Sequence, residues 1–233
     1  MDSEGVIQTD HQKIEEEILK FYKDLVGKSV GKLKSINLVD LRNGPQLNND
    51  QRDALSCSIF DAKIKTALYG IHDNTAPGID GFGAKFFKAS WDIIKEDLGK
   101  AVREFFGSSC LLNAMNCTLV TLIPKVNNAT MIKDYRPISC CTTLYKVISK
   151  IMANRLSKVL NSIIDNSQAA FVPGNHIQDH ILLAFELIKG YNTNGAPPRC
   201  MIQMGLQKAN DTIEWCALEA IMKEMSFPQK FIN

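Results

Sequence analysis

Two groups of side chains in this sequence could take part in chemistry. The first is a pair of cations, Lys125 and Arg136, which flank a polar stretch between two apolar segments. A guanidinium binds phosphate oxygens through paired hydrogen bonds, and an ammonium binds them as a compact charge. The second is Asp211, a carboxylate that follows the apolar run Cys200–Leu206. A polar group beyond the carboxyl end of a strand lies where α/β proteins often place a site.

A β-hairpin is the element expected to position the two cations. The run Leu119–Ile123 is rich in strand-forming residues and is ended by Pro124. A polar turn at Asn127 and Asn128 separates it from the strand-like segment Asp134–Ser139. The hairpin would carry one cation near each strand, and the alternative is two surface cations that only flank a turn.

A strand followed by a helix is expected around Asp211. The run Cys200–Leu206 is short and apolar, which favours a buried strand. Asp211 stands three residues before Glu214, the spacing of a capping box. The following apolar residues recur at helical spacing: Leu218, Ile221, Met222 and Met225. Capping is the favoured role for Asp211.

The first seventy residues predict two helices and a connector. Apolar residues at helical spacing with acidic residues between them predict an amphipathic helix over His11–Val26. Residues 27–50 are rich in Gly, Asn and Lys and contain Gly44-Pro45, so they are predicted to form a connector. An imperfect apolar stripe predicts a weaker helix over Asp53–Tyr69.

A loop and a strong helix are predicted next. Pro77 and Gly78 suit the central positions of a type II turn. The helix that follows carries one apolar face: Phe87, Trp91, Ile94, Leu98, Val102 and Phe105.

Another predicted helix, Leu144–Leu160, carries Lys146, Lys150 and Lys158 at helical spacing. This basic stripe could follow a nucleic-acid backbone or could be an ordinary solvent-facing surface. A further helix follows Gly174, with Ile177, Ile181, Leu182, Phe185 and Ile188 on its apolar positions.

Composition limits the class of protein. The 233 residues are 45% hydrophobic with a net charge of +2. Residues 1–24 hold seven acids against three lysines, whereas residues 120–160 hold seven Lys or Arg against one Asp. A local basic block can mark a surface for polyanions. The seven cysteines form no C-x-x-C pair and no secretory signal is evident, so an intracellular location with free thiols is expected. No apolar run is long enough to span a membrane.

Several motifs together resemble the reverse transcriptases of plant non-LTR (LINE-type) retrotransposons. The family's first palm motif is matched at its non-catalytic positions: Leu206, Lys208, Ala209, Asp211, Ile213 and Trp215. Residues 76–82, Ala-Pro-Gly-Ile-Asp-Gly-Phe, are similar to its first fingers motif, and the segments around Lys125 and Arg136 are similar to its fingers hairpin. The resemblance covers about residues 50–233 in the family's order.

The resemblance implies an α+β fold: the helix-rich fingers of a right-hand polymerase plus the first strand and helix of the palm. It divides the chain into an N-terminal helix and connector (1–50), the fingers region (51–198) and the beginning of the palm (199–233). It also implies that Lys125 and Arg136 face the incoming triphosphate and the template. Gln168 and Gly174 belong to a loop that contacts the template, although Asn175 replaces the family's basic residue.

The chemistry of the family requires two Mg²⁺ ions held by aspartates. The first of these aspartates falls on Gly205, and the Asp-Asp pair that supplies the others does not occur in the sequence. We therefore expect this chain to be a truncated reverse transcriptase domain that is inactive alone, with no cofactor of its own. A non-catalytic module that binds RNA or an RNA/DNA hybrid is the alternative, and a translated remnant without a role is the third. An incomplete palm sheet would leave an open edge, which predicts self-association.

Overall fold

The computed structural model describes residues 7–26, 37–165, 167–168, 172–189, 191, 200, 202 and 213–233. The chain divides into two compact units, one comprising Met1–Leu33 and Cys57–Ala153, and the other comprising Lys34–Ser56 and Asn154–Asn233. Each unit has an apolar core of its own. The described residues form many helices and one small antiparallel sheet, which is the expected α+β class. None of the described helices is long and apolar enough to cross a membrane.

Helices form the base of the first unit. They are α4 (Asp61–Tyr69), α5 (Ala84–Ala89), α6 (Trp91–Ser108) and the part of α7 (Thr143–Leu156) up to Ala153. Their apolar faces meet in a core of buried side chains: Ile59, Ile64, Ala67, Leu68, Ile71, Ala84, Trp91, Leu98, Val102, Val147, Ile148 and Ile151. The apolar face predicted for the helix after the loop is therefore confirmed, but the helix is interrupted at Ser90 and consists of α5 and α6.

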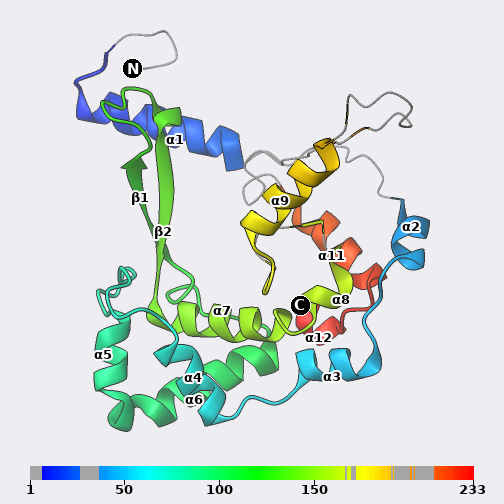
Figure 1. Cartoon of the computed structure of the whole chain (residues 1–233). Coiled ribbons are helices and arrows are strands. Elements are labelled where there is room, and N and C mark those ends of the chain that lie inside the picture. The colour runs from blue at the N-terminus through cyan, green and yellow to red at the C-terminus, as the bar shows by residue number, and fades with distance from the viewer. Residues whose placement is uncertain are drawn as a thin grey trace. The chain divides into compact units, whose positions relative to one another are not determined.

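The predicted hairpin is present. Strand β1 (Thr118–Pro124) pairs antiparallel with β2 (Tyr135–Cys141), with Thr118 opposite Cys141 and Pro124 opposite Tyr135. A 3-10 turn, η1 (Ile132–Asp134), leads into the second strand. In Figure 1 the hairpin extends from the helical base, and α1 crosses near its far end.

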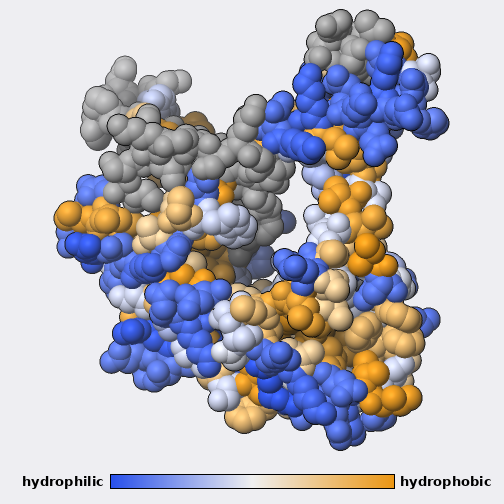
Figure 2. All heavy atoms as spheres, turned by 180° about the vertical axis from the view of Figure 1, so that it is seen from behind, coloured by the Kyte–Doolittle hydropathy of each residue, from blue (hydrophilic) through white to orange (hydrophobic). Residues whose placement is uncertain are grey.

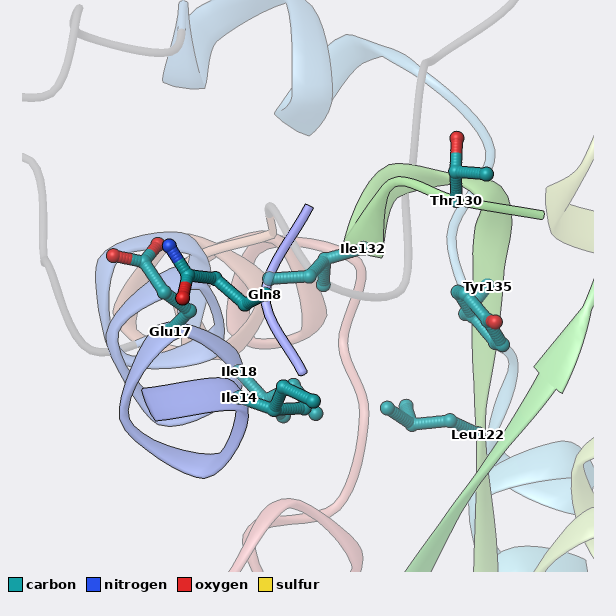
Figure 3. A pocket seen from close by; sticks show the side chains of 8 residues that line it. All are labelled: Gln8, Ile14, Glu17, Ile18, Leu122, Thr130, Ile132 and Tyr135. Atoms are coloured by element: carbon teal, nitrogen blue, oxygen red, sulfur yellow. The ribbon is translucent and has the colours of Figure 1, made fainter. Parts of the chain in front are cut away.

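Helix α1 spans His11–Val26, as the sequence predicts. Its half-buried Ile14 and Ile18 point across a cavity of about 320 Å³ toward Leu122 of β1 and Tyr135 of β2 (Figure 3). Packing of apolar side chains against this end of the hairpin explains why the helix is amphipathic.

The second unit joins segments that are distant in the sequence. Its helices are α2 (Leu38–Asn43), α3 (Asn49–Ser56), α8 (Leu160–Ile163), α9 (Ile177–Ile188), α11 (Trp215–Glu224) and α12 (Gln229–Ile232). Its core contains Leu47, Leu55, Val159, Ile163 and Phe227. The buried Arg155 donates from Nη1 to the Leu55 carbonyl at 3.1 Å, and the Leu47 N–H donates to the Met225 carbonyl at 3.2 Å.

Several predicted boundaries are wrong. The stretch expected to be a connector contains α2 and the start of α3. The single helix expected over Asp53–Tyr69 is interrupted at residues 57–60, because Leu55 packs in the core of the second unit and Ile64 in the core of the first. The predicted helix Leu144–Leu160 is also interrupted, since α7 ends at Leu156.

The start of the last long helix differs from the prediction as well. Helix α11 begins at Trp215 with Glu214 as its N-cap residue, and Asp211, for which a capping role is predicted, lies outside the described residues. The helix itself is confirmed. The strand predicted over Cys200–Leu206 lies mostly outside the described residues.

An ion pair links α2 to α11 and should make stability depend on pH. Arg42 Nε lies 2.5 Å from Glu224 Oε2, and this hydrogen bond lowers the pKa of Glu224 below its ordinary value of 4.5. Because the pKa is lower in the folded state, the pair stabilises the fold above pH 4.5, and this stabilisation disappears as the pH falls through the folded-state pKa. We expect Glu224→Gln to lower the urea midpoint at pH 7 and to have little effect at pH 3. An equal decrease at both pH values would contradict this role.

Candidate nucleic-acid interface

Lys125 and Arg136 lie on the same face of the hairpin. Arg136 is directly opposite Ile123, and directly opposed residues point to one side of a sheet. The Lys125 N–H donates to the Asp134 carbonyl at 2.7 Å, which continues the pairing one residue beyond β1. Since side chains alternate along a strand, Lys125 shares the face of Ile123 and Arg136. Lys125 and Arg136 are diagonal neighbours across the two strands, and the Cα atoms of such residues lie roughly 7–8 Å apart.

The two cations differ in how they are held. Lys125 Nζ donates to the Lys133 carbonyl at 2.8 Å, which keeps its ammonium near the turn. Arg136 is exposed and forms no salt bridge within the described part of the chain. Asp134, the hairpin's one acidic residue, accepts a hydrogen bond from the Met131 N–H at 3.2 Å and does not pair with either cation. With three cations, Lys125, Lys133 and Arg136, against the one carboxylate of Asp134, the hairpin carries a net charge of +2.

Exposed apolar side chains accompany the cations. Leu119, Ile123 and Ile138 are 52%, 48% and 41% exposed, and the register places all three on the face of Arg136. Figure 2 shows hydrophobic side chains along the hairpin, below a hydrophilic surface at its far end. A surface that combines aliphatic side chains with cations can contact both the sugars and the phosphates of a nucleic acid.

Helix α1 lies against the opposite face of the hairpin near its turn end, while Val120 farther along that face is 53% exposed. Leu122 and Tyr135, which line the cavity under α1, alternate with Ile123 and Arg136 along their strands. The Tyr135 hydroxyl donates to the Ala129 carbonyl at 3.1 Å and fixes the turn. Because α1 packs on this side, the face with the cations remains open.

Three contacts fasten the junction of β2 and α7 to the loop before α5. The Thr143 hydroxyl donates to the Phe82 carbonyl at 2.8 Å, and Lys146 Nζ donates to the Ala76 carbonyl. The third contact is at Gly78, where a Cβ atom would lie 2.5 Å from the Thr142 nitrogen. Sequence reasoning missed Thr142 and Thr143, which are fully buried at the junction of β2 and α7. The sequence feature that could have indicated this anchor is the pair of adjacent threonines shortly after a predicted strand.

The turn in this loop differs from the predicted one. A type II turn centred on Pro77 and Gly78 requires positive φ at Gly78, but the glycine with positive φ in this loop is Gly81, at 74°. The Gly81 N–H donates to the Gly78 carbonyl at 3.1 Å, so the turn lies two residues later in the chain. Gly78 is required for close packing rather than for its backbone conformation.

Removal of the Thr143 hydroxyl should weaken this anchor. We expect Thr143→Ala to lower the free energy of unfolding by about 1–2 kcal/mol, because the Phe82 carbonyl loses its donor. Thr66 is a matched control, since its hydroxyl also donates to a backbone carbonyl, that of Ala62, but is exposed. Thr66→Ala should change stability by less than about 0.5 kcal/mol. Equal losses in the two variants would argue against the anchor.

The predicted basic stripe is only partly present. Lys146 is half-buried and binds the Ala76 carbonyl, while Lys150 is exposed on the same helix with its Cε beside Gly70. Lys158 lies beyond the end of α7, in a turn where its N–H donates to the Arg155 carbonyl at 3.2 Å. The prediction of one continuous stripe on one helix is therefore wrong, because the helix ends before its third lysine.

Gln168 and Gly174 belong to the second unit, in a loop before α9. The Asn175 side chain donates to the Gln168 carbonyl at 2.8 Å and ties the two ends of this loop together. Gly174 has a φ of 88° at the turn. Their predicted contact with a template stays a prediction.

The two-magnesium centre of the family depends on a carboxylate at the position of Gly205. Magnesium is bound in proteins mainly by carboxylates. Gly205 has no side chain, and the nearest following carboxylate, Asp211, is the single one between residues 187 and 213. Residues 203–212 lie outside the described part of the chain. Within the part that is described, no three His, Cys, Asp or Glu side chains gather in a way that could hold a metal ion.

Comparisons with known proteins show what this chain is similar to. Residues 123–233 match the family described as reverse transcriptase (RNA-dependent DNA polymerase). Over 231 residues the chain is 26% identical to the Transposon TX1 uncharacterized 149 kDa protein of Xenopus laevis. That alignment covers 99% of this chain and 17% of the relative, so the chain spans about one sixth of the relative's length. These comparisons support a reverse transcriptase domain related to that of a transposon protein.

Proposed function

We propose that this chain is a reverse transcriptase domain that does not add nucleotides to a primer by itself. The observation that carries the proposal is Gly205, which stands where the family has its first metal-binding aspartate. A backbone carbonyl cannot replace the negative charge of a carboxylate beside a divalent ion. The loss of even about 4 kcal/mol of transition-state stabilisation slows a reaction roughly a thousandfold.

A primer-extension assay tests this proposal. The purified chain is incubated with a primed RNA or DNA template, all four deoxynucleotides and either Mg²⁺ or Mn²⁺. We expect no extension above the level without protein, whereas an active polymerase in parallel extends the primer. Robust extension by the purified chain would refute the proposal.

A second function, binding of RNA or an RNA/DNA hybrid without catalysis, is supported by the hairpin. Lys125 and Arg136 share its open face, and the hairpin's one acid, Asp134, is hydrogen-bonded to the backbone. Phosphate contacts of this kind need no metal and no acidic residue. Binding would be independent of sequence, because backbone phosphates are the same at every nucleotide.

Salt dependence distinguishes this binding from apolar association. We expect the affinity for single-stranded RNA to fall steadily as salt rises, with a slope of about 0.7 in log–log units for each phosphate contacted. Fluorescence anisotropy of a labelled oligonucleotide, titrated at about 50 to 200 mM salt, measures this slope. Absence of binding at low salt would end the proposal.

Two further properties belong to the same proposal. The seven cysteines are free thiols, which supports an intracellular location in a reducing compartment. Self-association of the chain would make the molecular mass rise with concentration, which sedimentation measures. A constant monomer mass would contradict it.

A further inference from the structure

A second concave surface with excess positive charge lies in the first unit. It surrounds the turn after α4, encloses about 560 Å³ and is lined by Tyr69, Gly70, Ile71, His72, Asp73, Asn74, Lys85 and Lys88. None of these residues belongs to the hairpin, and none was singled out by the sequence patterns. We call this surface the α4–α5 basin.

We propose that the α4–α5 basin binds a backbone phosphate of the same nucleic-acid strand, as a contact separate from Lys125 and Arg136. The inference rests on the proposed nucleic-acid binding. It adds a second site, and therefore a longer path for the strand along the first unit.

Cations from three helices converge on the basin. Lys85 and Lys88 come from α5. Lys150 of α7 reaches its edge, with Cε 3.4 Å from the position of a Cβ at Gly70. Lys65 of α4 places Nζ 5.6 Å from the centre of the Tyr69 ring. The one carboxylate that lines the basin is Asp73, so the lining residues carry a net charge of +1 when His72 is neutral.

The cations have different roles. Lys88 is largely buried, and its Nζ lies 2.6 Å from both the Ile71 carbonyl and Asp73 Oδ1. This hydrogen bond lowers the pKa of Asp73, so the pair neutralises itself and fixes the turn. Lys85 is exposed and forms no salt bridge within the described residues, which leaves its ammonium available for a ligand.

His72 supplies a donor of a different kind. Its Nδ1 accepts the Asn74 N–H at 3.2 Å, so the neutral ring carries its proton on Nε2. An ammonium and an imidazole N–H at one concave surface suit a phosphate, whose oxygens accept several hydrogen bonds.

An exposed aromatic ring favours a nucleic-acid strand over other anions. Tyr69 is 49% exposed at the edge of the basin. Sites for single-stranded nucleic acids combine cations that bind the backbone with aromatic rings on which bases stack. An acidic peptide or free phosphate would use the cations but would gain nothing from the ring.

Three substitutions test the basin in the full chain by RNA-binding anisotropy at 50 mM salt. Lys85→Ala removes one phosphate contact, and we expect it to weaken binding about 5–10-fold and to lower the salt slope by about 0.7. Asp73→Asn removes the opposing charge but keeps an acceptor for Lys88, and it should strengthen binding by about threefold. Lys95 of α6, exposed and outside the basin, is the control, and Lys95→Ala should change affinity by less than about twofold.

The outcomes separate the basin from the hairpin. If Lys125→Ala/Arg136→Ala weakens binding but Lys85→Ala and Asp73→Asn do not change it, the basin proposal is wrong and the hairpin proposal stands. If Lys85→Ala weakens binding and Asp73→Asn strengthens it, but Lys125→Ala/Arg136→Ala does not change it, the basin proposal stands and the hairpin proposal is wrong. If the chain binds no RNA, both fail.

Titration with inorganic phosphate distinguishes the two sources of the ligand. We expect no saturable binding of inorganic phosphate alone by calorimetry. Saturable binding that Lys85→Ala abolishes would assign the basin to free phosphate and would overturn its assignment to a strand.

Discussion

Replacement of Gly78 by alanine is expected to lower the free energy of unfolding by about 2–4 kcal/mol. The added Cβ would lie 2.5 Å from the Thr142 nitrogen and 2.7 Å from the Cys141 carbonyl carbon and Thr142 Cα. These are backbone atoms at the junction of β2 and α7, so they cannot move aside as a flexible side chain would. Urea unfolding followed by circular dichroism measures the change.

Substitutions at two other glycines of the same loop distinguish the effect of close packing from the effect of backbone conformation. Gly81 has open space around its Cβ position but a φ of 74°, so Gly81→Ala should cost about 1–2 kcal/mol. Gly83 has a φ of −83° and a nearest neighbour at 3.8 Å, so Gly83→Ala should be nearly neutral. A loss at Gly78 no larger than that at Gly83 would show that the loop does not pack against the hairpin base as described.

The double substitution Lys125→Ala/Arg136→Ala is expected to weaken RNA binding about 50-fold at 50 mM salt and to lower the salt slope by about 1.4. The expectation follows from the loss of two phosphate contacts, each contributing about 0.7 to the slope for a single strand. Both side chains are exposed, so the fold should be retained. Anisotropy titrations at several salt concentrations measure both quantities.

The matched control removes two cations elsewhere in the first unit. Lys95 and Lys100 are exposed on α6, and their double replacement by alanine changes the net charge equally. We expect this control to weaken binding by less than about threefold, through the general field alone. Equal losses in the two double variants would mean that net charge, rather than the hairpin, determines binding.

Local patterns were sufficient to predict the elements with a clear period. The bounds of α1, the hairpin and the buried face of α7 follow from apolar spacing and from turn residues. The apolar spacing also predicted α9, but the apolar side chains of α9 are mostly exposed in the structure, with Phe185 at 69% and Leu182 at 63%. The spacing of apolar residues predicts that a segment forms a helix. Whether those side chains are buried depends on which other segments of the chain pack against the helix.

Non-local packing explains what the sequence could not predict. The interruption between α3 and α4 allows Leu55 and Ile64 to enter different cores. The division of the chain, which groups residues 34–56 with residues beyond 153, depends on contacts between distant segments. Gly78 was assigned to a turn because a sequence does not reveal which backbone will lie 2.5 Å away.

In the candidate site, too, local features could be predicted from the sequence and tertiary contacts could not. The residue types and the turn between them predicted Lys125 and Arg136 as a pair, and the register puts both on one face. The basic stripe was extended to Lys158 because no Gly or Pro between residues 144 and 160 signals the end of α7. The anchor at Thr142 and Thr143 depends on tertiary hydrogen bonds that have no sequence period.

The position of a bound strand tests the central claim, that the open face of the hairpin holds nucleic acid. RNA containing photoreactive uridines is bound to the full chain at low salt and irradiated, and the crosslinked peptides are identified by mass spectrometry. We expect crosslinks within residues 118–141, and we expect Lys125→Ala/Arg136→Ala to abolish them. Efficient crosslinking that never includes residues 118–141, or that is unchanged in the double variant, would contradict the claim.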